Sequence, residues 1–217
     1  MEPIQTTEYK GHTIKIYPDD SPESPREWDN VGHMTCFHRH YDLGDKHHID
    51  AANFDGWDAV AAYLRDEEQA TVMLPLYLYD HGGITMRVGG FSGCPLPQGH
   101  REFDTMMVGF IWCTAAEIEA QWGTGADARG KAVNRLTGEV QTYDQYLRGD
   151  VYGYVVEGMD MAEIDSCWGF YGMEYAIAEA QSIVDWHIEN RIKAHATQVK
   201  AWIKAGVPLV YRQPLTL

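Results

Sequence analysis

The sequence predicts an α+β protein built on a mostly antiparallel sheet of about 5–7 strands, flanked by about 3–4 helices. Strand-like segments come in neighbouring pairs joined by turn residues, without the alternation of strand and helix that is typical of a parallel sheet. The chain has 13 Tyr and 7 Trp, and aromatic residues are enriched in strands. We find no internal repeat and no linker, so we expect residues 1–217 to form a single domain.

The first quarter of the chain predicts two strands and a helix. Residues 8–17 are rich in β-formers, and three prolines within eight residues then indicate a loop. Residues 33–38 predict a second, short strand. Asn53 is suited to cap a helix over 54–67, whose apolar residues at helical spacing form one buried stripe: Trp57, Val60, Ala61 and Leu64.

The middle of the chain predicts a hairpin, a further strand and a capped helix. Residues 71–80 and the ITMRV segment flank Asp80-His81-Gly82-Gly83, which is typical turn chemistry. Residues 89–106 predict a long loop, and 107–114 a buried strand. Thr114 and Glu117 are spaced as a capping box for the helix that follows.

The last third predicts a helix over 129–148, interrupted near Thr137-Gly138, and strands over 151–158 and 165–172. The segment 173–205 has apolar residues at spacings of three and four throughout, which predicts a helix that is long for a chain of this size. Such a helix either breaks, or it projects and packs against another subunit. In the second case the protein would be a homo-oligomer through this helix. The tail after Gly206 and Pro208 is expected to return as an edge strand.

The formal net charge of −15 disfavours direct binding to nucleic acid, whose phosphates repel an acidic surface. No apolar run approaches the roughly 20 residues that a membrane span needs, and the N-terminus has no signal-peptide pattern. We therefore expect a protein of the bacterial cytoplasm with no membrane partner. The four cysteines are widely spaced and are expected to be buried free thiols: Cys36, Cys94, Cys113 and Cys167.

The stretch from Asp19 to Asp50 is the part of the chain that is richest in ionisable groups, with five histidines and eight carboxylates. One interpretation is an acidic binding surface made of Asp19, Asp20, Glu23, Glu27, Asp29, Asp42 and Asp45. A second is a site for Zn or Mn made of His33, His38, His40, Asp29 and Asp42. The spacing matches no established metal motif, and a solvated acidic loop explains the same residues without any cofactor.

Two strands near residue 160 alternate glycine with aromatic residues. The side chains of Trp168, Phe170 and Tyr171 are able to stack a nucleotide base, which suggests a site that sequesters a nucleotide signal. The alternative is that the aromatic rings cover glycines within the sheet. The sequence has no P-loop, no GxGxxG and no GxSxG, and it identifies no catalytic residue, so enzyme activity is uncertain and not favoured.

Four segments resemble an uncharacterised family of small proteins from tailed phages, plasmids and integrative elements. They are SPREWDNVGHMTCFHRHYDLGD, LPLYLYDHGGITM, TYDQYLRGDVYGYVVEG and DSCWGFYG, in the same order over residues 14–172. That family has Thr after WDNxG, whereas this chain has His33, and the family supplies no catalytic residues. The resemblance implies an accessory gene, and such genes frequently encode inhibitors of host defence systems, including CRISPR and restriction.

The leading expectation is therefore a phage or mobile-element protein that inhibits a host defence system by binding through its acidic surface. Its partner would be a host defence protein or ribonucleoprotein complex with a basic surface, and it would need no cofactor. The alternative is a metal-dependent enzyme or metal-stabilised binder that uses the cluster at 29–48. The third hypothesis is the nucleotide-signal sponge.

Overall fold

The computed structural model describes residues 2–91 and 105–214 of the chain. These residues form two compact units, and each is treated by itself below. Unit 1 comprises residues 1–22 and 150–217, and unit 2 comprises residues 23–149. The division describes packing and does not test whether the chain folds as one domain, so that expectation stays a prediction. No helix in the described part combines the length and the apolar character that a membrane crossing requires.

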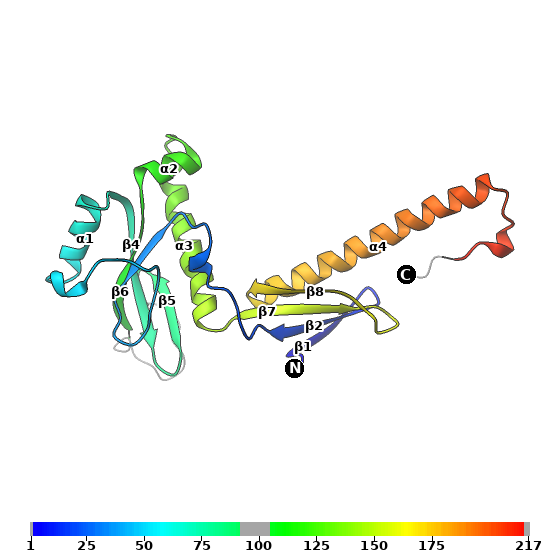
Figure 1. Ribbon diagram of the computed structural model, residues 1–217, viewed down its shortest axis with the longest axis horizontal. Helices are drawn as coiled ribbons and strands as arrows, with labels where there is room; N and C mark the ends of the chain where they lie inside the picture. Colours follow the sequence, from blue (N-terminus) through cyan, green and yellow to red (C-terminus); the bar gives the residue numbers. More distant parts are fainter. Residues whose placement is uncertain (1, 92–104, 215–217) are drawn as a thin grey trace. The chain divides into compact units, whose positions relative to one another are not determined.

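The α+β class, the antiparallel pairing and the long C-terminal helix are confirmed. Eight strands are present among the described residues, and they form two sheets of four rather than one sheet of 5–7. In unit 1 the strand order is β1-β2-β7-β8, with β1 at Gln5–Tyr9, β2 at His12–Pro18, β7 at Val151–Glu157 and β8 at Glu163–Tyr171. The helix α4, Met173–Lys204, crosses one face of this sheet (Figure 1).

Alternation along β2 determines which face of the unit 1 sheet is covered. Ile14 and Ile16 are buried, whereas Thr13, Lys15 and Tyr17 are only half-buried. They pack with Tyr154 and Val156 of β7 against the small residues that α4 presents at successive turns, Ala176, Ala180 and Val184. These side chains allow the helix to lie close to the sheet, and they form the core of unit 1.

The expected strand over 8–17 is in fact two strands. Lys10 and Gly11 both have positive φ, at 48° and 77°, and they turn the chain between β1 and β2. Such a turn directs two adjacent residues into the left-handed region, and it joins antiparallel neighbours tightly. The expectation of one strand here was wrong because the alternating pattern continues through the turn.

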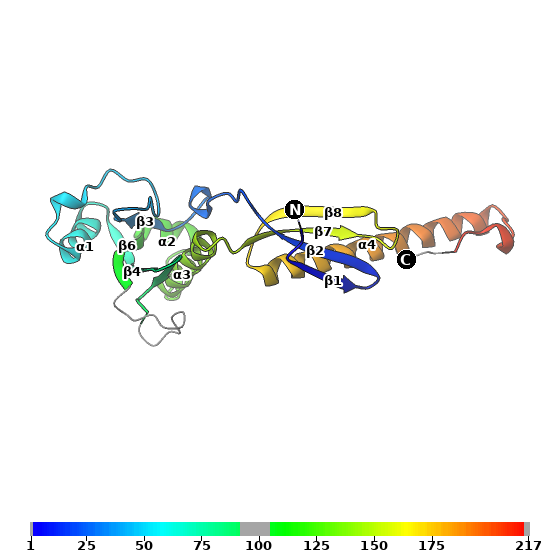
Figure 2. The same cartoon turned by 90° about the horizontal axis from the view of Figure 1, so that it is seen from below.

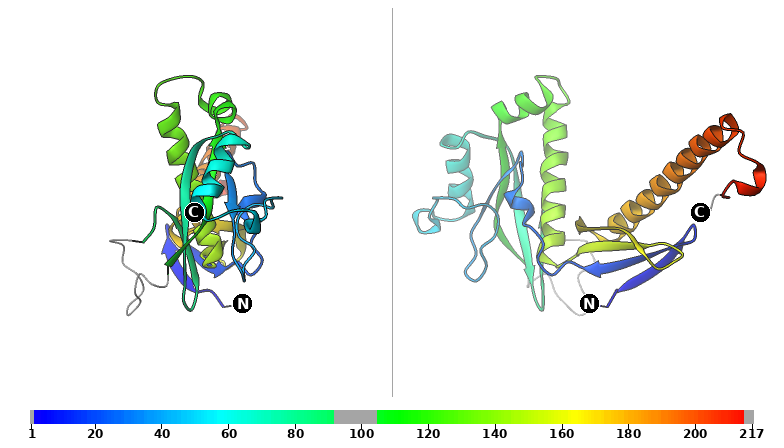
Figure 3. Two further views of the ribbon diagram at one scale, coloured as in Figure 1. Left: turned by 90° about the vertical axis from the view of Figure 1, so that its left-hand side faces the viewer. Right: turned by 45° about the vertical axis from the view of Figure 1, so that its right-hand side comes forward.

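The helix α4 runs without a break for 32 residues, or about 48 Å at 1.5 Å per residue. Its buried residues lie in its first half only, and beyond Ile188 no residue of the helix is buried. The following segment turns back along the end of the helix instead of forming an edge strand (Figure 3). His195 Nε2 lies 3.1 Å from the carbonyl of Gln213, and Arg212 donates to the carbonyl of Val207.

Unit 2 is a second sheet that lies between helices (Figure 2). Its strand order is β3-β6-β4-β5. The strands are β3 at His33–Cys36, β4 at Ala70–Asp80, β5 at Ile84–Val88 and β6 at Thr105–Thr114. The helix α1, Trp57–Asp66, packs on Phe110 and Trp112 on one face. The helices α2, Ala115–Trp122, and α3, Ala128–Leu147, cover the other face, where the main core lies.

Several local expectations for unit 2 are confirmed. Val60, Ala61 and Leu64 of α1 are buried, and Asp80–Gly83 joins β4 to β5. Thr114 and Glu117 form a capping box at the start of α2. Two expectations are wrong: α1 is capped by Gly56 rather than Asn53, and α3 is continuous through Thr137-Gly138. A single glycine costs a helix about 1 kcal/mol, which the packing of Leu136, Val140 and Tyr143 exceeds.

Candidate functional site

The stretch from Asp19 to Asp50 leaves unit 1 after β2 and continues into unit 2. Asp19 and Asp20 belong to unit 1, and the residues from Glu23 onward belong to unit 2. Asp19 is half-buried, and its carboxylate accepts a hydrogen bond from the amide of Ser21 at 3.0 Å. The seven carboxylates of the predicted acidic surface are thus divided between the two units, and five of them form the part in unit 2.

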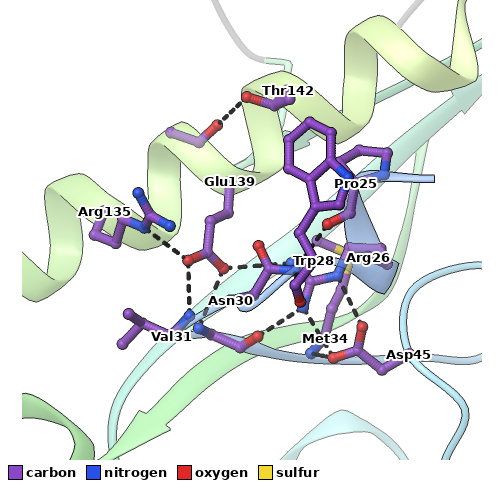
Figure 4. A network of polar contacts seen from close by, with 12 residues as sticks. Pro25, Arg26, Trp28, Asn30, Val31, Met34, Asp45, Arg135, Glu139 and Thr142 are labelled. Carbon is purple, nitrogen blue, oxygen red and sulfur yellow. Dashed lines mark hydrogen bonds and ion pairs between the residues drawn. The ribbon is translucent and has the colours of Figure 1, made fainter. Parts of the chain in front are cut away.

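A network centred on Arg26 organises the beginning of the unit 2 stretch (Figure 4). Pro25–Glu27 forms a 3-10 turn that presents Arg26 inward, where its side chain is 5% exposed. Its Nε and Nη2 donate to the two oxygens of Asp45 at 2.8 and 2.9 Å, and Nη1 lies 3.3 Å from Glu139. Burial alone lowers the pKa of Arg26, but Asp45 and Glu139 raise it above its usual value. The guanidinium therefore stays charged.

Glu139 of α3 is the buried acceptor of this network, with its side chain 5% exposed. It accepts the backbone amides of Val31 and Gly32 at 3.0 and 3.1 Å, and the Nε of Arg135 at 2.9 Å. Gly32 is required here by space: a Cβ would lie 2.4 Å from Leu136 Cδ2 and 2.8 Å from the carboxylate of Glu139. The segment PREWDNVG is thus fixed to α3 by charge-assisted hydrogen bonds.

Asp45 is paired within unit 2, and its side chain is 28% exposed. Besides Arg26, it accepts the amide of Met34 at 2.7 Å, so both its oxygens are occupied by groups of the same unit. Asp45 therefore holds the loop after β3 against the Arg26 network, and its place in a binding surface stays a prediction. Glu139 was not predicted as a site residue from the sequence. It holds the same network to α3, as Asp45 holds it to the loop after β3.

Four other predicted carboxylates of unit 2 are exposed: Glu23, Glu27, Asp29 and Asp42. Between Glu27 and Asp29 lies Trp28, whose side chain is 43% exposed. The side chain of Asn30 fixes this turn by donating to the carbonyls of Pro25 and Trp28 at 2.8 and 3.0 Å. We call residues Glu23–Asp29 the acidic segment. It combines an exposed aromatic ring with carboxylates on a backbone that is held rigidly.

The histidines of the predicted metal site have different neighbours. His33 Nε2 lies 2.6 Å from Glu117 Oε1. The His33 ring is tilted against the ring of Trp112, with 4.6 Å between the ring centroids. His38 stacks on Tyr41 at 4.9 Å, and its ring lies 6.0 Å from that of His40. Within residues 2–91 and 105–214, no three His, Cys, Asp or Glu side chains are arranged to hold a metal ion. A metal at His33, His38, His40, Asp29 and Asp42 would require these side chains to move.

The loop after β3 borders an open hollow of about 740 Å³, lined by residues 36–38 and 41–51. His47 lies in its wall, with Nε2 2.9 Å from the carbonyl of Cys36 and its ring edge against Phe37. Burial raises the pKa of the Cys36 thiol to about 12. Since the thiolate is the reactive form, Cys36 is not suited to act as a nucleophile here.

The three aromatic residues of the nucleotide hypothesis lie on different faces of the unit 1 sheet. Gly169 has φ of +84°, and the register of β8 against β7 shifts at this point. Trp168 therefore lies beside Tyr17 on the face opposite α4, while Phe170 packs against Tyr154 in the core under α4. Trp168 covers Gly153, as in the alternative interpretation, and the three rings do not form one stacking platform.

Of the three cysteines in the described residues, Cys36 and Cys113 are buried, as expected, whereas Cys167 is exposed on β8. Cys94 lies outside the described residues. Comparisons of the chain with models of protein families, with curated proteins and with solved structures found no match.

Proposed function

We propose that this protein is a non-enzymatic interaction protein whose acidic segment, Glu23–Asp29, binds a basic surface of a partner protein. The observation that carries the proposal is the exposed Trp28 between the carboxylates of Glu27 and Asp29, on a turn fixed by Arg26 and Asn30. Tryptophan is enriched among the few residues that dominate binding energy at protein interfaces. A rigid turn also loses little conformational entropy on binding.

The charge of the molecule supports a basic partner. Unit 2 carries 19 Asp and Glu against 10 Lys and Arg, a net charge of −9. A field of this sign accelerates association with a positively charged surface, and salt weakens it. The binding surface consists of Glu23, Glu27, Trp28, Asp29 and Asp42, without Asp45. Asp19 and Asp20 belong to unit 1, where they carry charge of the same sign.

The resemblance to phage and mobile-element proteins supports one class of partner. We propose that the partner is a component of a host defence system, such as a CRISPR effector ribonucleoprotein or a restriction enzyme, in the bacterial cytoplasm. These complexes have basic grooves for nucleic acid, which an acidic protein is able to occupy.

A phage-plating assay tests the proposal. Expression of the protein in a host that carries a CRISPR or restriction system should raise the plating of a targeted phage. A variant with Glu23→Gln, Glu27→Gln and Asp29→Asn should lose the effect. The charge-matched control has Asp55→Asn, Asp66→Asn and Glu67→Gln, all exposed residues of unit 2, and should retain it. Unchanged plating against every system tried, or an equal loss in both variants, contradicts the proposal.

We also propose that the part of α4 from Trp186 to its C-terminal end mediates self-association. Trp186, Ile192 and Ile203 are exposed at 63%, 45% and 59%, which is unusual for large apolar side chains on one helix. Light scattering after size exclusion at several concentrations measures the mass directly. A dimer or higher oligomer that Ile192→Glu and Ile203→Glu convert to a monomer is expected, and a monomer at every concentration contradicts the proposal.

A further inference from the structure

Unit 2 has a hollow of about 520 Å³ on the side of α3 that faces α2. It is formed by three parts of the unit: the end of the acidic segment with the residues after it, the end of α2 and the first half of α3. Its lining residues are Asp29, Val31, Gln121, Trp122, Lys131, Asn134 and Arg135. The volume lies within the range of roughly 300–1,000 Å³ that is typical of small-molecule sites.

Arg135 is the lining residue whose orientation is fixed from below. Its Nε donates to the buried carboxylate of Glu139 at 2.9 Å, and Glu139 is itself held by Arg26 and by two backbone amides. This contact uses one edge of the guanidinium. The two terminal nitrogens have no further partner in the described part of the chain, and the side chain is 50% exposed. A planar pair of donors that is fixed in this way suits an oxyanion.

Other donors surround the same hollow. Lys131 lies one helical turn before Arg135 and Asn134 lies next to it, so all three side chains emerge from one side of α3. Gln121 contributes an amide from α2. Across the residues that the structure describes, none of Lys131, Asn134 and Gln121 has a hydrogen-bond or ion-pair partner for its side chain.

The lining also includes one carboxylate, Asp29, whose exposed oxygens have no partner in that same set. A ligand that was only an anion would be repelled by it. A hydroxyl group beside the anion would instead donate to it. The hollow is thus complementary to a ligand that carries several anionic oxygens at one end and a hydroxyl donor near the other.

We propose that this hollow binds a small phosphomonoester that also carries hydroxyl groups, such as a sugar phosphate. The phosphoryl group accepts hydrogen bonds from Arg135, Lys131 and the amides, and a hydroxyl donates to Asp29. A phosphoryl group has three acceptor oxygens, whereas a carboxylate has two. It can therefore accept hydrogen bonds from more of the donors around the hollow. The hollow shares Asp29 with the acidic segment, but its donors come from α2 and α3, so the proposal does not require that the acidic segment bind a partner protein.

Isothermal titration with two probes, inorganic phosphate and ribose 5-phosphate, tests the assignment on the full chain. Ribose 5-phosphate is expected to bind more tightly than phosphate. Lys131→Gln should weaken its binding by about tenfold or more, since it removes one charged contact. Arg129→Gln, which changes the same charge on the same helix outside the hollow, should change the affinity by less than about twofold.

Asp29→Asn distinguishes the proposal from non-specific charge attraction. It should strengthen the binding of inorganic phosphate, because it removes a repulsive charge. It should also reduce the preference for ribose 5-phosphate over phosphate, because the hydroxyl groups of the sugar lose their carboxylate acceptor. No binding of either probe at millimolar concentration overturns the proposal. So does an equal loss of affinity in Lys131→Gln and Arg129→Gln. Urea unfolding of each variant, expected to match the parent, shows that the fold is intact.

Discussion

Arg26 and Asp45 form a bidentate ion pair, with Nε and Nη2 of the guanidinium 2.8 and 2.9 Å from the two carboxylate oxygens. The two residues are 19 positions apart, and the chain between them includes the whole of β3. The pair closes this segment into a loop that is fixed to α3 through Glu139. The most charged stretch of the sequence is therefore organised first by internal pairing, and only its outer residues are available to a partner.

The first prediction concerns the stability of this network. Arg26→Ala removes the one ion-pair partner that Asp45 has within the described residues, and it leaves Glu139 with Arg135 alone. Loss of one partner of a buried ion pair costs about 3–5 kcal/mol, because the remaining charge stays desolvated. We expect a loss of this size in the free energy of unfolding, measured by urea denaturation of the full chain. Arg26→Lys should recover only part of it, since lysine cannot bond both oxygens of Asp45.

The control is Arg39→Ala, because Arg39 is exposed in the same stretch. It should change the free energy of unfolding by about 0.5 kcal/mol or less. An equally small change in the free energy of unfolding for Arg26→Ala and Arg39→Ala would show that the buried network contributes no more to stability than an exposed arginine does.

The second prediction concerns the contact between Trp168 and Gly153 in unit 1. A Cβ on Gly153 would lie 2.1 Å from Cε3 of Trp168, so Gly153→Ala must displace the indole ring. We expect Gly153→Ala to destabilise the protein by about 1–3 kcal/mol, the typical cost of overpacking. In a Trp168→Ala background the same substitution should cost much less, because the ring is no longer there. Additive effects in this double-mutant cycle would show that the contact is not the cause.

The sequence predicted the fold class more completely than the sites, and the reason is visible in particular residues. Periodicity identifies α1, α4 and most strands because burial follows one face of each element. Periodicity does not predict the position of Trp168, because alternation would place it on the same face as Phe170. A single bulge at Gly169 moves it to the opposite face.

The site was harder to predict because charge in a sequence does not distinguish exposed from paired groups. Asp45 and Asp42 look alike in the sequence, but only Asp45 meets Arg26. One signal for the network was present: Glu139 falls between Leu136, Val140 and Tyr143 in the buried stripe of α3. A carboxylate at such a position requires a buried partner, and Arg26 is that partner.

The third prediction concerns Glu117 at the start of α2. Burial raises its pKa, but hydrogen bonds from the Thr114 backbone and from His33 outweigh that effect and hold the pKa below its usual value. A group with a depressed pKa contributes stability above its unfolded pKa, roughly 4.3, and this contribution is lost as the pH falls through the folded value. Glu117→Gln should therefore destabilise the protein at neutral pH, and the difference from the parent should shrink below about pH 4.5.

Urea unfolding between about pH 7 and pH 3 measures this difference. Glu119→Gln is the matched control, because Glu119 is exposed on the same helix. The control curve should stay parallel to that of the parent. A constant gap between Glu117→Gln and the parent across the acid range would rule out the assigned role.

The fourth prediction tests the single-domain expectation. Unit 2 is one continuous segment, Glu23–Gly149, with its own sheet and with apolar clusters on both faces of that sheet. The Arg26 network also lies entirely within it. We expect a fragment of residues 23–149 to fold alone and to unfold in one cooperative transition, because a chain of this length buries enough apolar surface. Circular dichroism during urea denaturation measures this, and Arg26→Ala should destabilise the fragment as much as the full chain. A fragment without a cooperative transition would show instead that both units fold together, as the sequence analysis expected.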